Sequence, residues 1–584
     1  MKNIFKSRYQ VALYVLLLVA GGLYLFNLGG KGLWSAQEAR NGLAARNIIN
    51  GAFIDWIMPE IALERSTQKP VLFYWLVAVS CMIGKSISAF YVRLPAALSG
   101  LACALYMFYL GKRLFGLNIG LLAAIILSSC GKFLSLSRTS RIDIFLALCV
   151  VVILGECLLL YIDKKRYHLV LAYVMAAFAV LAKGPVGVVI PLAALLAFCI
   201  ALRRIRDIRM FVSIPAVVAF FVLVIPYYVI ANIATDGEFL YDFIIKHNIE
   251  RFIGLDGTFG SRKPIWYYLP NFFVGAMPWS LFIPILFGYF GLTIGKDCWF
   301  KISKRGVTPH GRNGCDDAAY TYIAICFAVI FLFFSFSSFK RGDYILPLYP
   351  FFALLLACCL SDESYLLKYI RWFRWVLYAL MGVMGALLIF VLISSAVDLP
   401  DWLFSQDIIR KYFNNNDRIT LEAIWTYSRR YTFILAALII ASIGFVWYSI
   451  IRSTERVNKI IVVITTLILA FYGYYFVSIE PEIDRFCTLE PFAGQVNLSV
   501  GGHELVMFHF WDHGLAFYLD RHIKSIYFFD ELEKYAASND KIYFVAEPKW
   551  FERIPEYLRD ECAILLRTPD YHRKDLLLCV HPAK

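Results

Sequence analysis

The chain has 584 residues, of which 60% are hydrophobic and 17% aromatic, and its mean hydropathy of +0.64 excludes a soluble globular protein. Its net charge is +14, but the basic residues cluster in short loops between apolar runs, so this charge does not indicate nucleic-acid binding. The fourteen cysteines lie mostly inside apolar runs and show no Cys-x-x-Cys or zinc-finger spacing, which favours buried small side chains.

Apolar runs long enough to cross a bilayer recur from the N-terminus almost to Ile479. The first resembles a signal peptide but lacks a clear small-residue cleavage site, so we interpret it as a retained helix. We expect about thirteen spanning helices, at residues 10–28, 91–111, 117–136, 144–162, 167–182, 184–202, 211–231, 266–292, 318–338, 343–361, 373–396, 431–451 and 457–478.

The loops between these runs predict the orientation of the chain in the membrane. With a cytoplasmic N-terminus every inner loop is basic, as in Asp163–Arg166, and this agrees with the positive-inside rule. The alternation holds only if residues 69–83 lie along the outer interface or dip into it without crossing. An odd number of crossings then places the residues after Ile479 outside.

Residues 480–584 are far less apolar than the rest and alternate between short strand and helix patterns. We expect strands at 505–510, 525–529, 541–545, 563–567 and 576–580, with helices at 512–518, 530–537 and 549–558. The predicted fold is therefore an all-α polytopic membrane domain over 1–479, with an outer-face loop at 29–90, and a small soluble α/β domain over 480–584.

Charged residues in apolar context gather on the predicted outer side. Positive charge is disfavoured there, yet cations outnumber anions, which indicates a bound polyanion. For each residue alone, simple solubility of an outer loop explains the charge about as well. The set comprises Glu38, Arg40, Lys69, Arg138, Arg141, Asp143, Lys183, Lys246, Arg251, Arg262, Lys263, Lys340, Arg341 and Asp343.

A ligand with an apolar tail and a charged head, such as a lipid-linked phosphate, suits charges at the boundary of lipid and water. Group transfer from such a phosphate needs Arg and Lys around the phosphate and a carboxylate near the acceptor hydroxyl as general base. Glu38 and Asp143 are the two carboxylates best placed for that role, and Arg40 lies close to Glu38 in the sequence.

An ordered set of short motifs runs through residues 33–350. The motifs are Leu33-Trp34-x-x-x-Glu38-x-Arg40, Lys69-Pro70 with Tyr74-Trp75, Val92-Arg93-Leu94-Pro95, Asp143, Lys183-Gly184-Pro185, Pro264-x-Trp266-Tyr267-Tyr268-x-Pro270, Pro278-Trp279, and Phe339-Lys340 followed by Asp343-Tyr344-Ile345-Leu346-Pro347. With these motifs the chain resembles the bacterial protein mannosyltransferase and lipid A aminoarabinose transferase group, which are integral membrane glycosyltransferases of the GT-C superfamily.

The resemblance implies an inverting transfer of a sugar from a polyprenyl-phosphate donor to a lipid, glycan or protein acceptor on the extracytoplasmic face of the bacterial inner membrane. By carry-over from the family, the donor phosphate would be held by Arg40 and Lys69, with help from Lys340 and Tyr344. Asp143 would belong to the catalytic cavity. Further cavity residues would be Gln37, Gln68, Lys183 and Arg262.

The chain departs from the family pattern at three places. Gln37 stands where the family usually has Asp, and Gln68 where aminoarabinose transferases tend to have Glu. Ser261 or Arg262 stands where a His is usual. The last two changes remove a Glu/His metal pair, so no metal or other cofactor is predicted. Because an amide cannot act as a general base, either Glu38 or Asp143 takes over, or the acceptor carries its own base, with Glu64 as a reserve candidate.

Two other classes of function compete with the transferase. A transporter for a polyprenyl-linked substrate would more often show inverted repeats and broken helices near the membrane centre. A catalytically altered relative or scaffold would retain binding, and in that case substitution of Glu38 would change nothing. The gathering of charge at one face favours an enzyme.

Overall fold

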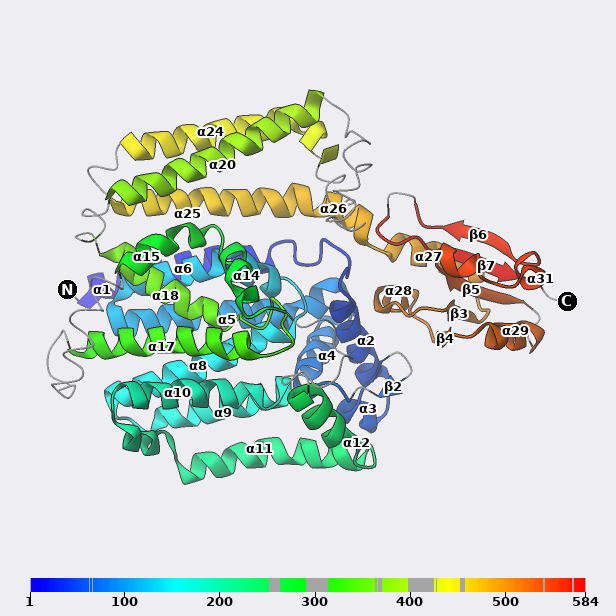
Figure 1. Ribbon diagram of the computed structural model, residues 1–584, viewed down its shortest axis with the longest axis horizontal. Helices are drawn as coiled ribbons and strands as arrows, with labels where there is room; N and C mark the ends of the chain where they lie inside the picture. The colour runs from blue at the N-terminus through cyan, green and yellow to red at the C-terminus, as the bar shows by residue number, and fades with distance from the viewer. Residues whose placement is uncertain are drawn as a thin grey trace.

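The computed structural model describes residues 2–61, 64–65, 67–250, 263–289, 314–362, 365, 370–396, 425–426, 428–451, 457–538, 541–569 and 572–582. Most of the N-terminal helices pack side by side along the long direction of the molecule, and a smaller C-terminal part lies beyond one end of this bundle (Figure 1). The helices of the bundle are α1 (Lys2–Leu25), α5 (Ala89–Phe115), α6 (Leu117–Ser129), α8 (Ile142–Asp163), α9 (Tyr167–Lys183), α10 (Val186–Ala201), α11 (Ile214–Ile233), α17 (Gly314–Phe336), α18 (Leu348–Ser361), α20 (Ile370–Ala396), α24 (Thr432–Ile451) and α25 (Val457–Tyr474).

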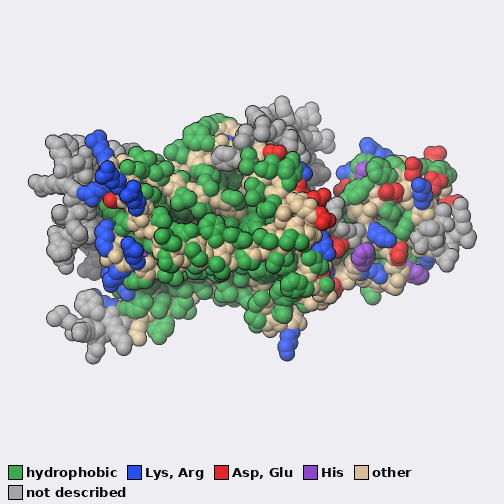
Figure 2. All heavy atoms as spheres, turned by 90° about the horizontal axis from the view of Figure 1, so that it is seen from below, with side chains coloured by type: hydrophobic (Ala, Val, Ile, Leu, Met, Phe, Trp, Pro, Cys, Tyr) green, Lys and Arg blue, Asp and Glu red, His purple; other side chains and the backbone are tan. Residues whose placement is uncertain are grey.

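Five of the described helices are long and apolar enough to cross a membrane, and up to seven spans result if each of two bent pairs is counted as one. α8 is fully buried within the bundle, whereas α11 is mostly exposed on its outside. Apolar side chains cover the surface between the two ends of the bundle (Figure 2). Lys and Arg gather at the end away from the C-terminal part.

Two segments that the apolar pattern predicts as single spans are broken. α6 and α7 (Gly131–Ser137) meet at an angle of 71° around Cys130, whose backbone is extended. The second pair bends by 109° near Pro278, which has no N–H to continue a helix. Its pieces are η4 (Ile265–Tyr267) with α14 (Tyr268–Gly275), and η5 (Trp279–Phe282) with α15 (Ile283–Tyr289).

The polar segment after α1 lies at the end of the bundle that faces the C-terminal part (Figure 1). It contains α2 (Ala36–Asn50), α3 (Phe53–Ile57), the paired strands β1 (Glu60–Ile61) and β2 (Glu64–Arg65), and α4 (Leu72–Gly84). With 13 residues, α4 is about 20 Å long, which is shorter than a spanning helix needs. Elsewhere, η1 (Ile205–Phe211) precedes α11, while α12 (Glu238–Leu240) and the π-helix η2 (Tyr241–Glu250) follow it.

The C-terminal part contains a five-stranded mixed sheet in the order β4-β3-β5-β7-β6. β3 is parallel to β4 and β5, whereas β7 is antiparallel to β5 and β6. Alternate strand residues bury against different neighbours, Met507 and Val545 in one cluster and Phe508 and Phe544 in another. The elements are η8 (Tyr475–Ile479), α26 (Glu480–Cys487), α27 (Glu490–Val500), β3 (Leu505–Phe508), α28 (His513–Leu519), β4 (Lys524–Ile526), α29 (Phe529–Ser538), β5 (Ile542–Ala546), α30 (Pro548–Phe551), α31 (Glu556–Arg559), β6 (Ala563–Arg567) and β7 (Leu577–His581).

The C-terminal part is fastened to the polar segment through α28 and α2. Arg46 donates a hydrogen bond to the carbonyl of Phe517 at 2.9 Å and pairs with Asp520 at 3.0 Å. Gly42 packs so closely that a Cβ there would lie 2.5 Å from the Phe517 ring. α2, which contains the predicted site residues Gln37, Glu38 and Arg40, is therefore held from the C-terminal side as well as by the bundle.

Candidate active site

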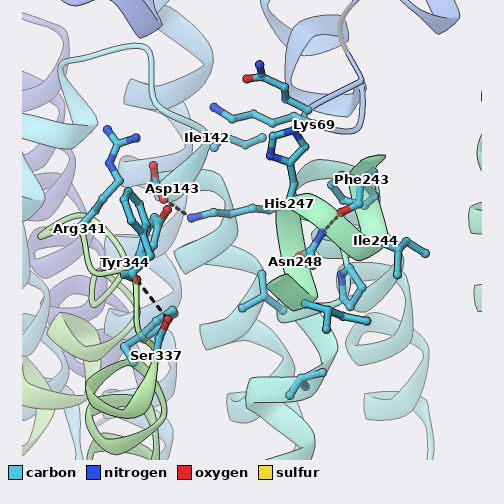
Figure 3. Close-up of a pocket in the computed structure, with 18 of the residues that line it drawn as sticks. Lys69, Ile142, Asp143, Phe243, Ile244, His247, Asn248, Ser337, Arg341 and Tyr344 are labelled. Atoms are coloured by element: carbon cyan, nitrogen blue, oxygen red, sulfur yellow. Dashed lines mark hydrogen bonds and ion pairs between the residues drawn. The ribbon is translucent and has the colours of Figure 1, made fainter. Parts of the chain in front are cut away.

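A cavity of about 560 Å³ lies where the polar segment meets the ends of α8, α9 and α17 and the helix η2 (Figure 3). Its polar lining residues are Gln37, Gln68, Lys69, Asp143, Lys183, His247, Asn248, Ser337, Arg341 and Tyr344. Its apolar lining residues are Ile142, Pro185, Val186, Val189, Phe243, Ile244, Ile249, Phe333, Phe334 and Phe339. The cavity thus combines a cluster of charges with a wide apolar wall.

Asp143 and Lys183 form an ion pair in this cavity. Asp143 is in the first turn of α8, and Lys183 is the last residue of α9. The chain turns sharply after Lys183 because Gly184 adopts a φ of +84°, and a Cβ there would lie 2.3 Å from the Phe243 ring. The Lys183 ammonium also lies 4.4 Å from the centroid of the Tyr344 ring, which holds it over an aromatic face.

Lys69 reaches the same cavity from the loop before α4. Desolvation lowers the pKa of Lys69 to about 7, and Arg40, Lys183 and Arg341 act in the same direction, whereas Asp143 raises it. An amine that titrates near neutral pH beside other cations is a group that gains by binding an anion. Lys69 is therefore well placed for the predicted contact with a phosphate.

Arg40 is not among the lining residues of the cavity. Its guanidinium donates a hydrogen bond at 2.8 Å to the side-chain oxygen of Gln68, which does line the cavity. The structure therefore separates the two predicted phosphate ligands. Lys69 lines the cavity, whereas Arg40 is connected to the cavity through its hydrogen bond to Gln68.

Glu38 is buried in an ion pair with Arg93, and neither residue lines the cavity. The carboxylate lies 2.8 Å from Arg93 Nε and also accepts a hydrogen bond from the backbone N–H of Ser140 at 3.1 Å. Burial by itself would raise the pKa of Glu38, but Arg93, Lys31 and the Ser140 N–H outweigh it and hold this pKa below its usual value. Arg93 also donates to three carbonyls of the segment after α1, so the pair holds that segment to α5.

The other predicted residues divide in the same way. Tyr344 and Gln37 line the cavity, and Gln37 accepts a hydrogen bond from Arg141. The ammonium of Lys340 instead donates to the carbonyls of Lys263 and Ser337 and does not line the cavity. Arg262 lies outside the described residues.

Comparison with known proteins finds similar sequences over part of this chain. Residues 68–230 match the family described as dolichyl-phosphate-mannose-protein mannosyltransferase. Over 363 residues, the chain is 28% identical to the undecaprenyl phosphate-alpha-4-amino-4-deoxy-L-arabinose arabinosyl transferase of Pectobacterium atrosepticum, covering 61% of this chain and 60% of that protein. The same-named protein of Pseudomonas aeruginosa is 26% identical over 355 residues, covering 60% of this chain and 59% of that protein. The alignments thus span about 60% of these relatives.

The fold comparison extends over nearly the whole chain. The crystal structure of ArnT from Cupriavidus metallidurans bound to undecaprenyl phosphate matches with a TM-score of 0.73 at 17% identity, covering 97% of both chains. The predicted resemblance to the mannosyltransferase and aminoarabinose transferase group is confirmed. With its apolar helices, the chain is a multi-pass membrane protein.

The chain departs from the expected pattern at the place where the resemblance implies a Glu/His metal pair. Gln68 offers an amide in place of a carboxylate, and Ser261 and Arg262 lie outside the described residues. Among the residues that the structure describes, no three His, Cys, Asp or Glu side chains form a group that could hold a metal ion. This donor set does not fit a Glu/His metal pair, and the expected absence of a metal stays a prediction.

Three contributions to the site were missed from the sequence. His247 and Asn248 enter the cavity from η2, a π-helix, and such irregular helices are frequent at functional sites. Lys132 lies next to the site because α6 and α7 are bent, a feature that the apolar run conceals. The ion pair between Glu38 and Arg93 joins residues that are far apart in the chain. The one hint of this pair in the sequence is that both residues belong to family motifs.

Proposed function

We propose that the protein is a membrane glycosyltransferase that moves a sugar from a polyprenyl-phosphate donor to an envelope acceptor, which is a lipid, a glycan or a protein. The observation that supports this function most strongly is the cavity itself, because it joins Lys69, Lys183 and Arg341 to a wide apolar wall. Such a cavity complements a ligand with a phosphate head and an isoprenoid tail.

In this proposal the donor phosphate binds against Lys69, Lys183 and Arg341. The first isoprene units lie on the apolar wall formed by residues such as Phe243 and Ile244 of η2. Arg40 acts through Gln68, orienting its amide and adding positive potential without direct contact. This assignment keeps the predicted role of Lys69 and makes Arg40 a positioning residue.

The reaction requires one base and one leaving group. The acceptor oxygen attacks the anomeric carbon of the sugar as the bond from that carbon to the phosphate oxygen breaks, and the bonding pair leaves with the polyprenyl phosphate. Asp143 takes the proton of the acceptor hydroxyl, and Lys183 keeps Asp143 oriented. The cations then stabilise the charge on the leaving phosphate. Glu38, enclosed by Arg93 and the Ser140 N–H, is the weaker candidate for the base.

The finer topology belongs to the same proposal. We expect thirteen spans, a cytoplasmic N-terminus, and residues 480–584 as an α/β domain on the extracytoplasmic face of a bacterial inner membrane. Support comes from the Lys and Arg side chains at the end of the bundle away from the C-terminal part (Figure 2). The cavity then opens on the extracytoplasmic side, where a lipid-linked donor and an envelope acceptor meet.

One observation favours a second candidate, a catalytically altered relative that binds the lipid donor without transferring its sugar. Both Gln37 and Gln68 line the cavity, and each is an amide where the family usually has a carboxylate. This candidate shares the donor site with the transferase and differs only in turnover.

The decisive experiment compares envelope lipids and glycans of a deletion strain with those of the same strain complemented by wild-type or Asp143→Asn protein, using mass spectrometry. The transferase predicts a sugar-modified species that returns with wild type and not with Asp143→Asn. If wild type restores no modification but the purified protein still binds a polyprenyl phosphate, the altered relative is correct.

A further inference from the structure

A second group of cations lies beside the cavity, around the carboxylate of Asp343. Lys132 Nζ is 2.7 Å from Asp343 Oδ1, while Arg141 and Arg341 lie 3.6 and 3.9 Å from Oδ2. Asp343 itself is buried. One carboxylate thus faces three cations, and only the Lys132 contact is a close ion pair.

These cations come from three different elements. Lys132 is in α7, the short helix that follows the bend after α6, and Arg141 stands at the N-cap position of α8. Arg341 belongs to the loop before α18 and also lines the cavity, on the side away from η2 (Figure 3). The group is therefore continuous with the proposed donor site and shares Arg341 with it.

The three side chains keep capacity for another partner. The side chains of Lys132 and Arg341 are 33% and 36% exposed, so a ligand can reach both. Arg141 donates to Gln37 and Ser35, but its Nε is buried without a hydrogen-bond partner among the described residues. A buried N–H donor of this kind destabilises the protein unless a ligand or a water molecule accepts its hydrogen bond.

The balance of charge points the same way. Among the described residues, the carboxylates of Asp143 and Asp343 face the four cations Lys183, Lys132, Arg141 and Arg341, and also Lys69, which is charged below about pH 7. A sugar phosphodiester brings one negative charge, which leaves part of this positive charge without a counter-charge. Partly buried charges that stay uncompensated are unfavourable, so the site has room for a second anion.

We propose that Lys132, Arg141 and Arg341 form a second anion-binding subsite, which holds a phosphate group next to the donor phosphate. The group is supplied by the acceptor headgroup or, for a donor with a diphosphate, by the second donor phosphate. Each guanidinium group can donate two parallel hydrogen bonds to the oxygens of a phosphate, and the Lys132 ammonium adds a compact positive charge. The subsite deepens the proposed function, because it rests on the donor phosphate lying at Lys69 and Lys183.

The experiment measures binding to the full-length protein in lipid nanodiscs with four compounds: farnesyl phosphate, farnesyl diphosphate, glucosamine 1-phosphate and glucosamine. Lys132→Met removes the charge, Lys132→Arg keeps it, and Lys165→Met is the control at an exposed lysine of an inner loop. If the acceptor supplies the anion, glucosamine 1-phosphate binds and glucosamine does not. Lys132→Met then weakens this binding at least about tenfold, while Lys132→Arg restores it.

If the donor supplies the anion, glucosamine 1-phosphate does not bind, and farnesyl diphosphate binds at least about tenfold more tightly than farnesyl phosphate. In that case Lys132→Met abolishes the advantage of the diphosphate and leaves farnesyl phosphate binding unchanged. The proposal is overturned if Lys132→Met alters neither measurement. Failure of farnesyl phosphate to bind wild type would instead contradict the proposed function, and the effect of Lys132→Met on the binding of farnesyl diphosphate and glucosamine 1-phosphate would still test the subsite.

Discussion

Glu38 and Asp143 are both buried carboxylates paired with a cation, yet their surroundings differ. Glu38 is enclosed by Arg93 and a backbone N–H at the junction of α2 and α5, and it is not among the residues that line the cavity. Asp143 pairs with Lys183 on the cavity wall, beside Lys69 and the ring of Tyr344. Burial and charge alone therefore do not identify a base; the position of the partner relative to the cavity does.

The largest effect expected from this comparison is on stability, at the Glu38 pair. Arg93→Met should lower the free energy of unfolding by about 3–5 kcal/mol, because it leaves Glu38 buried without its counter-charge. Thermal unfolding of the purified protein in detergent measures this loss. Glu38→Gln should reduce stability and activity together, and a stable Glu38→Gln protein without turnover would return Glu38 to the role of base.

Asp143→Asn should show the opposite pattern, with a loss of turnover and little loss of stability. We expect sugar transfer to fall about 100-fold, within the usual contribution of a general base, while the amide still accepts a hydrogen bond from Lys183. Single-turnover transfer from a defined polyprenyl-phosphate sugar measures the rate, and thermal unfolding provides the control. Wild-type turnover in this variant would place the base elsewhere.

Lys69→Met should weaken donor binding about tenfold through loss of one charge-assisted contact. Titration with a short polyprenyl phosphate measures the change, with Lys112→Met as the matched control, because Lys112 is exposed in the last turn of α5 and does not line the cavity. Equal affinity in the Lys69 variant and wild type would exclude Lys69 from the phosphate site.

The same lysine makes donor binding depend on pH. With a pKa of about 7 in the empty site, Lys69 loses its proton as pH rises above 7, whereas bound phosphate favours the charged form. Binding above pH 7 must therefore take up a proton, so affinity should fall by up to about tenfold per pH unit above neutrality. Lys69→Arg should flatten this dependence between pH 7 and 9, and an equally steep fall in that variant would assign the titration to another group.

The smallest effect concerns Gln37, which stands where the family usually has Asp. Gln37→Asp should keep the fold, with a change in stability within about 1 kcal/mol, because Arg141 retains an acceptor nearby. Thermal unfolding tests this expectation, with Gln37→Leu as the variant that removes the acceptor. A larger loss in Gln37→Asp than in Gln37→Leu would contradict it.

Sequence patterns anticipated features that depend on local composition and on motifs. The apolar runs predict most of the helices. The ordered motifs pointed to Lys69, Asp143, Lys183 and Tyr344, and in the structure these four residues line one cavity. The patterns failed where long-range packing decides the outcome. An apolar run does not reveal the bend between α6 and α7 that places Lys132, and a carboxylate next to a motif arginine does not reveal that Arg93 encloses it.

The contact between Gly42 and Phe517 has a consequence for which sequences this architecture tolerates. Gly42 is in the interior of α2, where glycine costs roughly 0.5–1 kcal/mol relative to alanine. Because the Phe517 ring leaves no space for a Cβ, the helix retains this cost as long as α28 is docked on it. In a saturation screen, position 42 should therefore accept larger residues only together with a smaller residue at 517, which would make the two positions vary as a pair.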